Sequence, residues 1–124
     1  MIIIDSSGWL EFFTDGPFAD EYAAHLKRPQ QVLTSTIALY EVYKWVKRER
    51  SEEEALSAVA TMQKTRVVPL TSEIALAAAD ISLAHRLAMA DSIMLATARA
   101  HDSELVTGDS DFKGIEGVTV FAKS

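Results

Sequence analysis

Two predicted strands in this 124-residue chain each lead into an acidic side chain. Asp5 directly follows residues 2–4 (III), and Asp109 follows residues 104–107 (ELVT) after one glycine. Three successive β-branched residues without polar alternation predict a strand buried on both faces. Ligands of open α/β sheets bind outside the carboxyl ends of the strands, so both acids are candidate site residues. The other candidates are Glu41 on a predicted helix, Asp91 at a predicted helix start, and Asp111.

An acidic cluster of this kind needs a positive partner. Two unit charges about 4 Å apart repel by roughly 4 kcal/mol at an effective dielectric of 20. Oxygen ligands without histidine or cysteine select a hard cation, Mg²⁺ or Mn²⁺. Such a cation suits phosphate chemistry, because it lowers the pKa of water and neutralises developing charge. The acids therefore predict metal-dependent hydrolysis of a phosphodiester bond.

Each acid also has a simpler interpretation. Asp5 could be a solvated strand end, and Asp91 could only cap its helix, because Asp is a preferred N-cap residue. Glu41 could form a salt bridge with Arg48 or Lys44 on its own helix. The loop GDSDF, which contains Asp109, has the composition of a plain turn.

The elements that would position these acids alternate between strand and helix along the chain. Alternation of this kind, with right-handed crossovers, predicts an α/β fold with a parallel sheet covered on both faces. The predicted strands are residues 2–4, 31–35, 66–70, 104–107 and 119–121. The predicted helices are residues 6–13, 18–26, 37–50, 51–65, 71–87 and 91–101, with Ser35-Thr36 and Asp91 as N-cap residues of two of them.

Composition limits the class of protein. The length is that of one domain, residues 1–124. There is no cysteine, which excludes disulfides and thiolate metal sites. We find no targeting segment and no apolar run near the roughly 18 residues of a membrane helix, and we expect a cytoplasmic protein without a membrane partner. The net charge of −6 argues weakly against a nucleic-acid partner.

Several stretches together resemble a known family. They are IIIDSSGWLEFF near the start, STIALYEVYKWV around Glu41, RLAMADSIMLATARAHDSELVTGDSDF toward the end, and the short closing strand. The chain resembles the PIN-domain ribonucleases, and most closely the VapC-type toxins of toxin–antitoxin pairs, from residue 1 to about 121. The resemblance implies a PIN-like three-layer α/β/α sandwich with a parallel sheet of about five strands. It also implies a Mg²⁺- or Mn²⁺-dependent endoribonuclease, neutralised by a cognate VapB-type antitoxin.

The resemblance also assigns roles to individual residues. Asp5, Asp91 and Asp109 would hold one or two metal ions, and Glu41 would be a ligand or orient the attacking water. Asp111 is the alternative for the last acid. The supporting hydroxyls would be Ser6 and Thr107, and the candidate RNA contacts are Lys44 and Arg48 in a basic helix end.

Two further expectations concern partners and rivals. The chain has more aromatic surface than a small monomer needs, which predicts a homodimer and an antitoxin groove. The residues concerned are Trp9, Phe12, Phe13 and Trp45. An Asp after a first strand also occurs in phosphoaspartyl phosphatases and receiver domains. The remaining alternative is a PIN-like module that binds a partner without catalysis.

Overall fold

The centre of the molecule is a five-stranded parallel sheet with strand order β3-β2-β1-β4-β5. The computed structural model describes residues 1–121. As predicted from its three isoleucines, β1 lies in the middle, and Ile3 and Ile4 have no exposed surface. The strands are β1 (Ile2–Ile4), β2 (Val32–Ser35), β3 (Arg66–Val68), β4 (Glu104–Thr107) and β5 (Val118–Val120).

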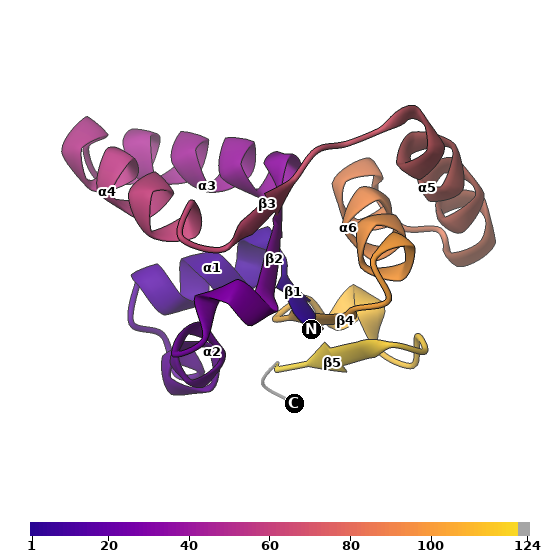
Figure 1. Ribbon diagram of the computed structural model, residues 1–124, viewed down its shortest axis with the longest axis horizontal. Helices are drawn as coiled ribbons and strands as arrows, with labels where there is room; N and C mark the ends of the chain where they lie inside the picture. The colour runs from indigo at the N-terminus through magenta and orange to yellow at the C-terminus, as the bar shows by residue number, and fades with distance from the viewer. Residues whose placement is uncertain (122–124) are drawn as a thin grey trace.

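Helices cover both faces of this sheet. Figure 1 shows α1 to α4 together on one side and α5 and α6 together on the other. The predicted three-layer α/β/α architecture is confirmed. The helices are α1 (Ser6–Phe13), α2 (Ala19–Leu26), α3 (Thr36–Glu49), α4 (Glu52–Met62), α5 (Ser72–His85) and α6 (Met89–Ala100), with short 3₁₀ turns at Pro29–Gln31 and Ser110–Phe112. None of the helices that the structure describes has the length and apolar character needed to cross a bilayer.

The sheet has a switch point between β1 and β4. From β1 the chain crosses to β2 on one side, whereas β4 pairs with β1 on the other side. The register places Ile4 opposite Val106, so both strands end at the same edge. A crevice at such a point is where open α/β sheets bind ligands. Asp5 and the loop that begins at Gly108 lie at this edge.

Most predicted boundaries lie within one or two residues of the observed ones, but two helices end early. Helix α4 stops at Met62 rather than near residue 65. Thr65 turns inward, donates to the Met62 carbonyl at 2.6 Å and contacts Thr34. Helix α5 stops at His85 because Arg86 takes a left-handed conformation, with φ of 56°.

Gly8 allows α1 to pack closely against β1 and α2. A Cβ atom at this position would lie 2.5 Å from the Tyr22 ring and 2.7 Å from Ile4 Cγ2, closer than carbon atoms can approach. We expect Gly8→Ala to lower the free energy of unfolding by about 1–3 kcal/mol, the usual cost of overpacking a core. Urea unfolding measures this. Gly117→Ala should not clash, because nothing lies within 4 Å of its Cβ position, although its positive φ adds some backbone strain. Equal stability of Gly8→Ala and wild type would contradict this packing.

Candidate active site

Helix α6 presents Asp91 in its first turn rather than at its cap. The predicted N-cap role of Asp91 is wrong: the N-cap residue is Ala88, and the helix begins at Met89. The hydroxyl of Ser92 donates to the Ala88 carbonyl at 2.9 Å and fixes this earlier start. The Asp91 carboxylate is therefore not used as a cap and can point toward the crevice.

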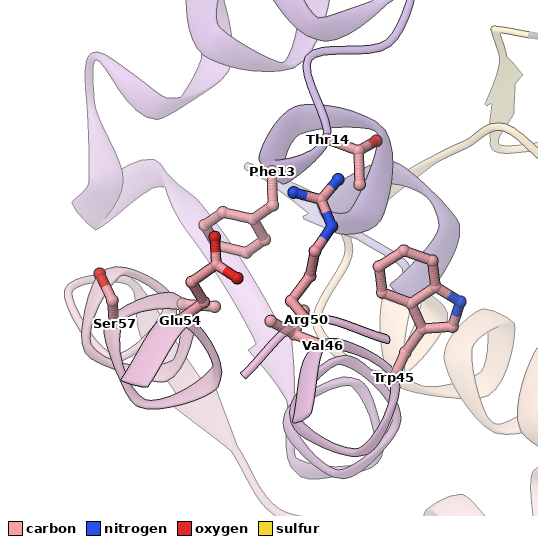
Figure 2. Close-up of a pocket in the computed structure, with 8 residues that line it drawn as sticks. Phe13, Thr14, Trp45, Val46, Arg50, Glu54 and Ser57 are labelled. Carbon is pink, nitrogen blue, oxygen red and sulfur yellow. The ribbon is translucent and has the colours of Figure 1, made fainter. Parts of the chain in front are cut away.

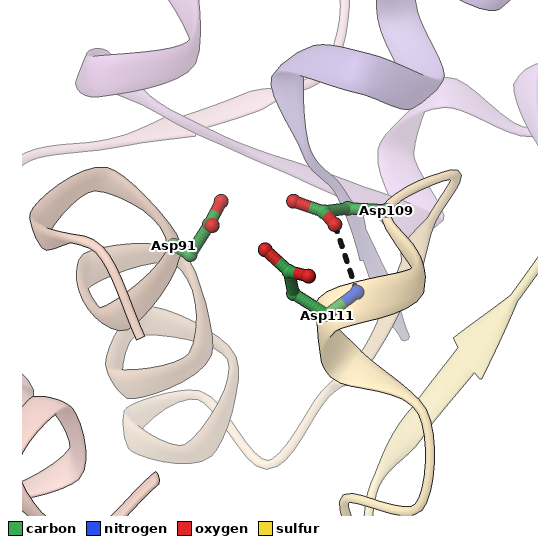
Figure 3. Close-up of side chains that lie close together, drawn as sticks. All are labelled: Asp91, Asp109 and Asp111. Carbon is green, nitrogen blue, oxygen red and sulfur yellow. Dashed lines mark hydrogen bonds between the residues drawn. The ribbon is translucent and has the colours of Figure 1, made fainter. Parts of the chain in front are cut away.

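The loop after β4 brings two more carboxylates to the same place. Asp109 accepts the backbone N–H of Asp111 at 2.9 Å, which caps the short 3₁₀ turn that follows. Figure 3 shows these two side chains facing Asp91 across the crevice. One oxygen atom from each of the three carboxylates lies within 4.8 Å of the others. Both candidates for the last acid therefore belong to the cluster.

Asp5 lies beside this cluster and is held by three donors. Its Oδ1 accepts from the Ser7 hydroxyl at 2.7 Å and from the Gly8 N–H at 3.0 Å, and its Oδ2 accepts from the Thr107 hydroxyl at 2.6 Å. Only 3% of Asp5 is exposed, which rules out a solvated strand end. A carboxylate oxygen has about two lone-pair sites, so Oδ2 retains one for a further ligand.

Two hydroxyls fasten the β4 loop to Asp5. Thr107 also accepts the Asp109 N–H, and Ser7 accepts the Gly108 N–H, each at 3.0 Å. The hydroxyl of Thr107, predicted to support the site, thus lies between Asp5 and the Asp109 backbone. Sequence reasoning missed Ser7, for which the only signal was a hydroxyl two residues after an acid at a strand end.

Glu41 enters the crevice from α3 and accepts a hydrogen bond from the Ser6 hydroxyl. Its alternative partners are engaged elsewhere. Arg48 contacts Glu49 at 3.0 Å, and Lys44 Nζ lies 3.3 Å from the Tyr40 hydroxyl. Among residues 1–121 no salt bridge of Glu41 forms. The structure therefore connects Glu41 to the segment that follows Asp5.

A family model for the PIN domain matches residues 2–118 of this sequence. The chain belongs to the PIN domain family. No curated protein matches the sequence.

Solved structures agree with this assignment. A toxin–antitoxin complex from Klebsiella pneumoniae superposes with a TM-score of 0.79 at 27% identity, covering 97% of each chain. VapC20 from Mycobacterium tuberculosis, a sarcin–ricin loop cleaving toxin, has a TM-score of 0.79 at 20% identity, covering 97% of this chain and 98% of that one. VapBC2 from Rickettsia felis, bound to promoter DNA, has a TM-score of 0.77 at 17% identity, covering 98% of each chain. The predicted resemblance to PIN-domain toxins is confirmed.

The acids of this PIN domain repel one another. Burial, followed by the charges of Asp109 and Asp5, raises the pKa of Asp91 to about 7. Burial also raises the pKa of Asp5, although its three hydrogen bonds oppose the shift. The salt bridges within the described part of the chain include none of these acids. Residues 1–121 therefore concentrate negative charge at the switch point and form no salt bridge that offsets it.

This donor set fits a hard divalent cation. The cluster offers carboxylate oxygens alone, the ligands that Mg²⁺ and Mn²⁺ prefer. Asp91, Asp109 and Asp111 could bind such an ion as they stand, and Asp5 could join them through Oδ2. Opposite charge favours the ionised form of a carboxylate, so a bound cation would reverse the upward shift in the pKa of Asp91.

The raised pKa of Asp91 makes stability depend on pH. Between its ordinary value of 3.8 and about 7, the folded protein holds a proton that the unfolded chain has released. The free energy of unfolding should therefore fall as pH rises through this window. We expect the free energy of unfolding to fall by about 1–2 kcal/mol between pH 5 and pH 8. This is less than the full shift in the pKa of Asp91 implies, because the site is partly solvated. Urea unfolding in chelator measures it, and stability that rises with pH would contradict it.

Proposed function

We propose that this PIN domain is an endoribonuclease that depends on Mg²⁺ or Mn²⁺. The observation that carries the proposal is the meeting of Asp91, Asp109 and Asp111 at the switch point of the sheet. Burial, followed by repulsion from Asp109 and Asp5, raises the pKa of Asp91 to about 7, and a divalent cation would relieve this repulsion. A bound ion would neutralise charge on the scissile phosphate and lower the pKa of the attacking water.

The acidic and hydroxyl side chains of the site would have different roles. Asp91 and Asp109 would hold the ion, and Asp111 and Oδ2 of Asp5 would be further ligands. Glu41, oriented by Ser6, accepts a proton or a hydrogen bond from the attacking water. Thr107 holds the backbone of Asp109 in place.

Lys44 and Arg48 are proposed to contact RNA phosphates. Both lie on α3 at helical spacing from Glu41, and both are exposed. Arg48 is partly neutralised by Glu49, whereas Lys44 lies over the Tyr40 ring and contacts no acid within the described residues. Replacing Lys44 with Gln should weaken RNA binding at low salt more than at high salt, since phosphate contacts are salt-dependent.

Cleavage of a mixed pool of structured and unstructured RNA tests the proposal. Parallel reactions would contain Mg²⁺, Mn²⁺ or chelator. We expect new 5′ and 3′ ends only with metal, and mapping these ends would begin to identify the substrate. Metal-independent cleavage, or no cleavage by protein that still binds metal and is freed of any co-purified partner, would contradict the proposal.

Two rival functions predict different results. A phosphoaspartyl phosphatase or receiver domain would form a covalent phosphate on Asp5, which mass spectrometry would detect after treatment with a phosphodonor. Assignment to the PIN family disfavours this rival. A non-catalytic binding module would neither bind metal nor cut RNA. The uncompensated charge of Asp91 and its neighbours disfavours it, because buried carboxylates without a partner are costly.

We further propose that the enzyme is the toxin of a VapBC-type pair and that its antitoxin binds near α1, α3 and α4. The toxin–antitoxin complex from Klebsiella pneumoniae supports an antitoxin partner. Figure 2 shows Phe13 and Trp45 on either side of Arg50, in a pocket of about 180 Å³ that Glu54 also lines. An apolar peptide segment with a charged residue would complement this pocket. A change in Trp45 fluorescence on adding a VapB-type peptide would test the placement.

Of the aromatic residues from which we predicted a homodimer, only Trp9 is removed entirely from the surface. Trp9 is completely buried, and Phe12, Phe13 and Trp45 pack against the core. The largest exposed apolar side chains instead include Leu76 and Leu83, two turns apart on α5 and 71% and 83% exposed. We propose this face of α5 as the homodimer contact.

A charge on this face should separate the subunits. We expect Leu83→Lys to shift the protein from dimer to monomer in analytical ultracentrifugation. The control is Leu56→Lys, at an exposed leucine of α4 on the other side of the sheet. A wild-type protein that is monomeric at high concentration would contradict the homodimer.

A further inference from the structure

A second cleft opens beside the acidic cluster and is not part of it. Its volume is about 510 Å³. Ser7, which donates to Asp5, lines one side, and Gly108 and Ser110, which flank Asp109, line another. A chain with its phosphate at the acids would therefore pass directly along this cleft.

Oxygen atoms of three residues surround Gly108, which lines the cleft. The Tyr22 hydroxyl is buried and has no hydrogen-bond partner among the described residues. A Cβ atom added to Gly108 would have three oxygen atoms as its nearest neighbours. They are the Phe121 carbonyl at 3.6 Å, the Ser7 hydroxyl at 3.6 Å and the Tyr22 hydroxyl at 3.8 Å.

Glu11 gives the cleft a negative wall. Its Oε2 accepts the Phe18 N–H at 2.9 Å, while Oε1 has no hydrogen-bond partner within the described part of the chain. Gly16 leaves room for this carboxylate, since a Cβ there would lie 2.0 Å from Oε1. Among residues 1–121, no lysine or arginine lines the cleft. The wall therefore repels phosphate and attracts N–H donors.

Phe18 and Phe121 form the apolar part of the wall. Their rings stack with centroids 6.0 Å apart and an angle of 20°. Single-stranded RNA is recognised by stacking of bases on aromatic rings together with hydrogen bonds to base edges. An aromatic pair beside the Glu11 carboxylate, of which Oε2 also accepts the Phe18 N–H, offers both kinds of contact.

We propose that this cleft binds a guanine of the RNA, next to the scissile phosphate. The Watson–Crick edge of guanine carries two adjacent donors, N1–H and N2–H, which match the two oxygens of the Glu11 carboxylate. Adenine, cytosine and uracil each present a donor beside an acceptor, which the carboxylate would repel. The inference rests on the proposed nuclease function, because that function brings RNA to the neighbouring acids.

Nucleotide binding in chelator tests the cleft without catalysis. GMP, IMP, AMP, CMP and UMP would be titrated into ¹⁵N-labelled protein by NMR. All five carry the same phosphate, and IMP differs from GMP only by lacking the N2 amino group. We expect GMP to bind about tenfold more tightly than IMP, the usual value of a hydrogen bond to a charged group. The amide signals of Phe18, Gly108 and Ser110 should shift.

Two variants locate the binding. Glu11→Gln keeps an acceptor for the Phe18 N–H but removes the charge, and should lower GMP affinity about tenfold to the level of IMP. Glu21→Gln makes the same charge change on the exposed side of α2 and should leave GMP affinity unchanged. Similar affinity for all five nucleotides, or an unchanged affinity in Glu11→Gln, would overturn the guanine site.

Mapping of cleavage ends separates this inference from the proposed function. Metal-dependent cleavage with a guanine at one fixed position beside the cut, lost in Glu11→Gln, would support both. Cleavage without any such guanine would overturn the guanine site and leave the nuclease standing. Selective GMP binding by a protein that cuts no RNA would support the guanine site and contradict the proposed nuclease function.

Discussion

Replacing Asp91 by Asn should lower the rate of metal-dependent RNA cleavage by about a hundredfold or more. The substitution removes one of three carboxylates that meet at the switch point. Even the mutation of a residue that only orients a metal ligand typically lowers metal affinity or activity about 10–100-fold. The fold should survive, because Asp91 does not cap α6. Single-turnover cleavage at saturating Mg²⁺ and Mn²⁺ measures the effect.

Stability measurements distinguish this result from unfolding. In chelator at pH 8, Asp91→Asn should raise the free energy of unfolding by about 1–2 kcal/mol, because it removes a charge whose pKa burial has raised to about 7. Asp80→Asn, at an exposed position of α5, should change neither cleavage nor stability appreciably. An Asp91→Asn variant that cuts RNA at the wild-type rate would remove Asp91 from the active site.

The second large effect concerns metal binding. Mn²⁺ or Mg²⁺ at about one hundred times its dissociation constant should raise the free energy of unfolding by about 2.7 kcal/mol, because the ion binds the folded chain alone. Thermal unfolding in metal and in chelator measures the difference. The metal should also reverse the pH dependence near neutrality, since it favours ionised Asp91.

The same experiment in variants identifies the ligands. Asp109→Asn should abolish the stabilisation by metal. Asp5→Asn should reduce it if Oδ2 is a ligand, and it should also cost stability because the buried donors of Ser7, Gly8 and Thr107 lose a charged acceptor. Stabilisation by metal that persists unchanged in Asp109→Asn would place the ion elsewhere.

The sequence predicted what local pattern determines. Ile2-Ile3-Ile4 indicated a buried central strand, and capping residues such as Ser35 and Ser51 marked the starts of α3 and α4. Asp91 shows the limit of such reasoning. Its preference for the cap position is a local one, but the buried Leu87 and the bonds of Ser92 set the helix start two residues earlier.

The remaining features depend on contacts between distant segments. The Ser7 hydroxyl accepts a hydrogen bond from the N–H of Gly108, 101 residues away in the chain, and no pattern around either residue predicts this contact. The same holds for surfaces. Trp9 was expected at an interface and is in the core, whereas Leu83 belongs to an Ala-rich helix and is exposed. One sequence specifies which residues are apolar, but the packing of layers decides which of them face solvent.

The hydrogen bond between Asp5 and Thr107 has a consequence for synthesis of the protein. It joins residues 102 positions apart, and the acidic cluster also needs Asp109 from the same late segment. At about 5–20 residues per second, roughly 5–20 s separate the translation of these two residues. A nascent chain therefore has no assembled acidic site until β4 emerges and pairs with β1. Truncated products of interrupted translation should therefore lack the nuclease activity that we propose for the complete site.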